Sequence, residues 1–83
     1  MANDKDKEEV RRQLESILSE LQTVRDEIRV RIHLAGMDLK DKWKELEARV
    51  EEIERSRPEA TQKLRDAAAD LREAFRALRE KVG

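Results

Sequence analysis

A row of apolar residues recurs every three or four positions from Val10 to Ile53. Its twelve steps cover 43 residues, about 3.6 residues per step, which is the period of an α-helix. Side chains at this spacing share one helix face, so the row forms a continuous apolar stripe. The stripe consists of Val10, Leu14, Ile17, Leu21, Val24, Ile28, Ile32, Ala35, Leu39, Trp43, Leu46, Val50 and Ile53. This pattern predicts one long helix over about 6–56.

Gly36 lies inside this stripe and leaves one alternative open. In that alternative, a first helix ends at Gly36 and a second begins with Asp38 as its N-cap, which gives a three-helix bundle. We favour the continuous helix because Ile28, Ala35 and Leu39 keep the same face across the glycine. A single glycine in a helix interior costs only about 1 kcal/mol relative to alanine.

Pro58 marks the end of the long helix, because proline cannot continue a helix but fits the first turn of a new one. A second apolar stripe follows over about 59–82: Ala60, Leu64, Ala67, Leu71, Phe75, Leu78 and Val82, widened by Ala68 and Ala74. The short connection favours an antiparallel helical hairpin of the coiled-coil type. The expected hairpin core is Leu39, Trp43, Leu46, Val50, Ile53, Leu64, Leu71, Phe75 and Leu78.

The two predicted helices differ in length, at about 75 Å and about 36 Å. The shorter helix can cover only residues 31–56, which leaves the stripe from Val10 to Ile28 in water. Each large apolar side chain left there forfeits roughly 1.5–3 kcal/mol. We therefore expect an antiparallel homodimer, with a higher oligomer as the alternative. Its predicted interface adds residues on the opposite helix face and comprises Val10, Leu14, Ile17, Leu21, Val24, Ile28, Val30, Ile32, Leu34 and Met37.

The composition indicates a folded helical chain and argues against nucleic-acid binding. Charged residues make up 47% of the 83 residues, but the ordered apolar periodicity is typical of long helices and not of disorder. The 19 basic and 20 acidic residues are interleaved, whereas nucleic-acid binding needs clustered positive charge. We expect a single helical domain over 1–83, with a disordered tail at 1–5.

Candidate catalytic and metal-binding residues are few. The sequence has no cysteine and one histidine, His33. A helical metal site of the Glu-x-x-His type fails here, because the residue three positions before His33 is Val30. Two copies of His33 near a dimer axis would make association sensitive to pH. We predict no catalytic residue, metal or cofactor, and no enzymatic activity.

The sequence therefore predicts a non-enzymatic structural or interaction protein, a small self-associating scaffold or adaptor whose main partner is a second copy, with another protein as a further partner. No run reaches the roughly 20 apolar residues of a membrane span, and we expect a cytoplasmic protein. One alternative is an amphipathic protein that coats membranes or granules, for which the basic residues Arg65, Arg72, Arg76 and Arg79 are the candidates. A second alternative is an architectural nucleic-acid-binding protein, which the charge pattern disfavours.

Overall fold

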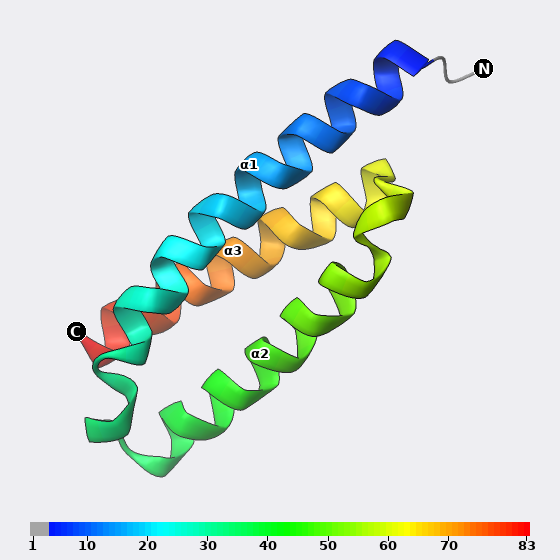
Figure 1. Cartoon of the computed structure of the whole chain (residues 1–83). Coiled ribbons are helices and arrows are strands. Elements are labelled where there is room, and N and C mark those ends of the chain that lie inside the picture. The colour runs from blue at the N-terminus through cyan, green and yellow to red at the C-terminus, as the bar shows by residue number, and fades with distance from the viewer. Residues whose placement is uncertain (1–3) are drawn as a thin grey trace.

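The chain folds as three α-helices joined by two short connections, and the computed structural model describes residues 4–83 (Figure 1). The helices are α1 (Asp4–Arg29), α2 (Met37–Ser56) and α3 (Gln62–Val82). Short 3₁₀-helices lie in the connections: η1 (Ile32–Leu34) and η2 (Arg57–Glu59). The predicted tail, 1–5, overlaps the start of α1 at Asp4, and its residues 1–3 lie outside the described residues.

The prediction of a single helix over 6–56 is wrong, because the chain reverses direction between α1 and α2. The three-helix alternative matches the observed number of helices, but α1 ends at Arg29, before Gly36, and the N-cap of α2 is Gly36 and not Asp38. Breaking the helix gives up a few backbone hydrogen bonds, each contributing about 0.5–1.5 kcal/mol net. In return, α3 of the same chain covers α1, and each buried leucine or isoleucine there contributes roughly 1.5–3 kcal/mol. Burial therefore outweighs helix continuity.

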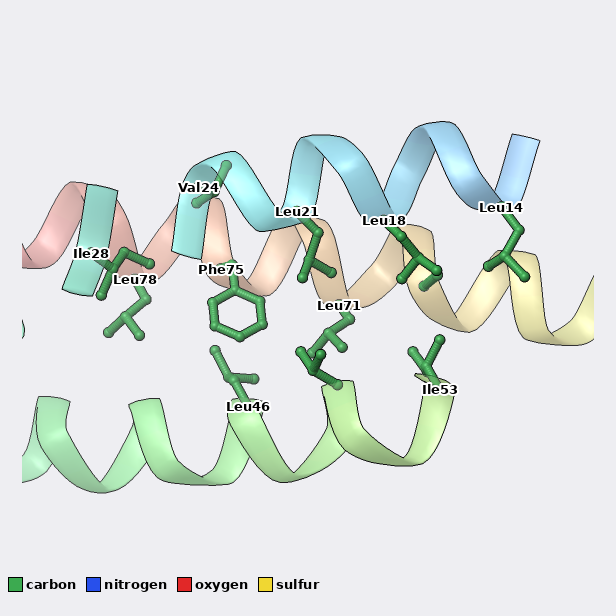
Figure 2. Packing of buried hydrophobic residues seen from close by; sticks show 12 residues of the cluster. Leu14, Leu18, Leu21, Val24, Ile28, Leu46, Ile53, Leu71, Phe75 and Leu78 are labelled. Carbon is green, nitrogen blue, oxygen red and sulfur yellow. The ribbon is translucent and has the colours of Figure 1, made fainter. Parts of the chain in front are cut away.

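The three helices enclose one apolar core that runs along the length of the bundle (Figure 2). Each helix contributes residues at steps of three or four, so that one face of every helix points to the bundle axis. The core residues are Leu14, Leu18, Leu21, Val24 and Ile28 from α1, Leu46, Val50 and Ile53 from α2, and Ala68, Leu71, Phe75 and Leu78 from α3. Trp43 packs edge-on against Phe75, with ring centroids 5.8 Å apart and an interplanar angle of 81°.

α1 and α3 run in the same direction, and α2 runs opposite to both (Figure 1). Side chains spaced seven residues apart on α3 contact side chains spaced seven apart on α1. The pairs are Arg65–Gln13, Arg72–Glu20 at 2.7 Å and Arg79–Glu27 at 3.3 Å. Every pair is separated by 52 positions in the sequence. The constant offset shows that the two helices lie parallel in one register.

A more enclosed ion pair joins α1 to α2. Arg25 contacts the Glu47 carboxylate with two nitrogens, at 2.6 Å and 3.3 Å. The two side chains are 15% and 24% exposed, whereas most of the other pairs lie at the surface. A forked arginine–carboxylate contact is directional, so this pair helps to set how α2 lies against α1.

Local features of the sequence determine the turn between α2 and α3. Pro58 lies in η2, and Ala60 adopts a left-handed conformation with φ 44° and ψ 50°. Thr61 is the N-cap of α3, and its hydroxyl oxygen accepts a hydrogen bond from the Leu64 N–H at 3.1 Å. A proline, a left-handed residue and a capping hydroxyl together end one helix and start the next.

We expect Thr61→Ala to lower the free energy of unfolding by about 1 kcal/mol, because the substitution removes the side-chain cap of α3. Urea denaturation followed by circular dichroism measures this loss. Thr61→Ser is the matched control, since it keeps the hydroxyl and should retain most of the stability. Equal destabilisation by both substitutions would contradict the assignment of Thr61 as a cap.

Candidate interaction surface

The large apolar side chains left exposed in the described residues all come from the segment that joins α1 to α2. Val30 is 66% exposed, Leu34 is 81% exposed and Met37 is 71% exposed. We refer to these three residues as the connection patch. They surround η1 at one end of the bundle, opposite the end that holds Pro58 (Figure 1). These three residues are therefore the candidate apolar contact surface of the described residues.

The connection patch borders shallow hollows between the connection and the end of α3. Val30 lines one hollow, with Glu27, Arg31, Arg79 and Glu80 around it. The second hollow is lined by Arg31, Leu34, Ala35, Gly36, Leu39, Lys81, Val82 and Gly83. This end of the bundle is therefore uneven, with apolar side chains projecting beside open recesses.

Charges of both signs border the connection patch. Arg31 lies before η1, and Asp38 lies in the first turn of α2. In the part of the chain that the structure describes, neither side chain has an ion-pair partner, whereas Arg29 lies 4.0 Å from Asp26. Arg31 and Asp38 are both exposed, and the Arg31 guanidinium lies close to Gly83 at the end of α3.

The predicted oligomer interface divides into two groups. Most of its α1 members lie in the core of the single chain, where α3 covers them: Leu14, Leu21, Val24 and Ile28 are buried, and Val10 and Ile17 are half-buried. Ile32 is half-buried and packs against the same core. Only Val30, Leu34 and Met37 are exposed. The unpaired stripe that the sequence indicated therefore has its cover within the chain, and the surface available to a partner is the connection patch.

The predicted hairpin core lies within the common core. Its buried members are Leu46, Val50, Ile53, Leu71, Phe75 and Leu78, and its half-buried members are Leu39, Trp43 and Leu64. Two core residues were missed. Leu18 is 7% exposed, and Ala68 is fully buried while Ala67 is exposed. The signal for Ala68 was available, since Leu64, Ala68, Leu71, Phe75, Leu78 and Val82 follow steps of four and three without interruption.

The basic residues of α3 point towards α1. Arg72 and Arg79 contact Glu20 and Glu27, and Arg72 is only 22% exposed. Arg76 also lies 3.4 Å from Glu20. These guanidinium groups already have carboxylate partners in the chain, which lowers their availability to phosphate groups of lipids or nucleic acids.

Other candidate chemistry finds little support in the described part of the chain. His33 is exposed in η1. Within residues 7–83, no group of three or more His, Cys, Asp or Glu side chains is arranged to hold a metal ion. None of the described helices has both the length and the apolar character that crossing a membrane requires. Comparison of the chain with protein-family models, curated proteins and solved structures found no match.

Proposed function

We propose that this protein is a non-enzymatic interaction module of the coiled-coil type that binds a second copy of itself, end to end, through the connection patch. The observation that carries the proposal is the exposure of Val30, Leu34 and Met37 at one end of the bundle. Elsewhere the described large apolar side chains are buried or half-buried. Burying this patch is the main gain in hydrophobic free energy still open to the folded chain.

Charge supports a second copy as the occupant. A twofold contact packs the same surface of both copies together, so that residue i of one copy meets residue j of the other and the reverse. Arg31 of each copy can then face Asp38 of the other. The chain carries a formal net charge of −1, so two copies repel each other only weakly. The end of the bundle is thus complementary to itself in both apolar surface and charge.

The size of the patch sets the expected strength of association. Three exposed side chains provide a surface on the order of a few hundred Å², comparable to the largest apolar patches of monomeric proteins. A standard interface buries about 800 Å² on each partner. We therefore expect a reversible dimer with a dissociation constant in the micromolar range or weaker, suited to a scaffold or adaptor that assembles with concentration.

We expect the mass in solution to rise from 9.8 kDa towards twice that value between low micromolar and millimolar concentrations. Sedimentation equilibrium measures this change. Leu34→Asp should keep the protein monomeric across that range, because association would bury an unpaired carboxylate. Gln62→Asp is the matched control, since it introduces the same charge at an exposed position at the other end of the bundle and should leave association unchanged.

Two outcomes would overturn the proposal. A monomer at millimolar concentration would exclude self-association as the function. Binding to vesicles rich in phosphatidylserine, present in the parent chain and lost in Leu34→Asp, would instead favour a membrane-coating role in which the patch inserts beside Arg29 and Arg31. Vesicle co-sedimentation at low salt distinguishes self-association from membrane coating.

A further inference from the structure

The α1–α2 connection departs from helical geometry at few positions. Arg31 keeps a right-handed helical conformation, and the N–H groups of Arg31, Leu34 and Ala35 donate to carbonyls three residues earlier at 2.9–3.0 Å. Ala35 and Gly36 are extended, with φ/ψ of −83°/162° and −70°/169°. Their φ angles are already close to helical values, so each residue needs mainly a rotation about ψ to join a helix.

No local feature of the sequence forces this break. The connection contains no proline, neither Ala35 nor Gly36 has a positive φ, and Gly36 caps α2 without a side-chain hydrogen bond. The α2–α3 connection differs on each count, with Pro58, the left-handed Ala60 and the capping hydroxyl of Thr61. The first connection is therefore kept bent by packing in the bundle, whereas the second is kept bent by its own residues.

The apolar stripe keeps its phase across the first connection. Ile28, Ile32, Ala35 and Leu39 follow steps of four, three and four, as on one face of a helix. If residues 30–36 all became α-helical, the core faces of α1 and α2 would lie in line on a single helix spanning 4–56. That helix would expose the α1 stripe, and another opened chain carries the same α2 and α3 surfaces that cover the stripe in the closed chain.

We infer that the α1–α2 connection is a hinge, and that two copies of this chain exchange their α1 helices by straightening it. In the exchanged dimer, α1 of one copy packs on α2 and α3 of the other, antiparallel to α2 and parallel to α3 as in the closed chain. The core contacts among α1, α2 and α3 are kept, so the closed and exchanged forms differ mainly at the connection, as in other domain-swapped proteins. The inference rests on the proposed self-association, because the connection patch brings two hinges together.

Gly36 offers a matched pair of substitutions that shift the hinge in opposite directions. A Cβ added at Gly36 meets nothing within 4 Å, so the closed chain has room for either side chain. Gly36→Ala favours the continuous helix about fivefold per chain, hence about thirtyfold in the dissociation constant of a dimer with two opened hinges. Gly36→Pro fits the closed form, because the φ of −70° at Gly36 and the extended Ala35 suit proline. It disfavours the continuous helix about thirtyfold per chain, and about a thousandfold per dimer.

Cross-linking between chains identifies the exchanged form directly. Glu20 of α1 contacts Arg72 of α3 at 2.7 Å within the closed chain, and the chain has no natural cysteine. One preparation carries Glu20→Cys and a second carries Arg72→Cys. The two are unfolded together, refolded at millimolar concentration and treated with a short bis-maleimide. Only an exchanged dimer places the two thiols, which are on different chains, side by side.

We expect a covalent species of twice the chain mass, increased in the Gly36→Ala background and lost in the Gly36→Pro background. A dimer that persists with no such cross-link, and with equal affinity in both backgrounds, would overturn the hinge while leaving the proposed association through the patch intact. A monomer in every background would overturn both. Circular dichroism confirms that each variant is folded before its mass is interpreted.

Discussion

Replacing Phe75 with alanine is expected to lower the free energy of unfolding by about 3–5 kcal/mol. Phe75 is fully buried, lies at the centre of the core and packs edge-on against Trp43 (Figure 2). It belongs to α3, which contacts both α1 and α2, so the cavity opens between all three helices. A chain of 83 residues has a total stability of about 4–12 kcal/mol. The substitution therefore removes a large part of that stability.

Urea denaturation followed by circular dichroism measures this loss, and the fluorescence of Trp43 reports on the same site. Phe75→Leu is the matched control, because it keeps most of the volume and should cost less than about 1.5 kcal/mol. Leu34→Ala provides a second comparison at an exposed residue and should change stability by no more than about 0.5 kcal/mol. A loss at Leu34 as large as that at Phe75 would show that the connection end, and not the bundle axis, holds the core.

Replacing Leu21 with alanine is expected to lower the free energy of unfolding by about 2–5 kcal/mol. Leu21 is 1% exposed and lies on the stripe of α1 that the helices of the same chain cover. Because the covering helices belong to the same chain, the loss should be the same at low micromolar protein concentration and tenfold above it. A stripe covered only by a partner would instead give a stability that depends on concentration.

Denaturation of the parent chain and the variant at both concentrations measures this dependence. Ser19→Ala is the matched control, since Ser19 is an exposed residue of α1 two positions before Leu21. A penalty for Leu21→Ala that shrinks on dilution would contradict the single-chain core. That result would show that a second copy covers the stripe of α1 in a dimer interface.

The helices and most of the core were predictable from local patterns. The 3.6-residue period predicts α-helix over most of the chain, as observed outside the α1–α2 connection, and Pro58 marks a boundary that the structure places in η2. The core positions Leu46, Phe75 and Leu78 follow from the same spacing. Local patterns succeed here because backbone geometry alone determines which side chains share a helix face.

The break between α1 and α2 was not predictable in this way. Ile28, Ile32, Ala35 and Leu39 keep their phase whether the chain is straight or folded back, because each helix must present a stripe to the core in either case. Gly36 did not decide between the two arrangements, since its φ of −70° is open to any residue. The candidate site depended on the same choice, because folding back buries Leu21 and leaves Leu34 exposed.

The long apolar stripe by itself determined that this protein is helical, that its helices bury one face, and that residues 10–28 need a cover. Tertiary structure decided which helix provides that cover. Placing α3 against α1 recovers the hydrophobic free energy of most of the α1 stripe within one chain, and the connection over residues 30–36, with Ala35 and Gly36 extended, permits it. A small local change in backbone geometry thus separates a closed bundle from an open helix, since the gain that selects between them comes from contacts far apart in the sequence.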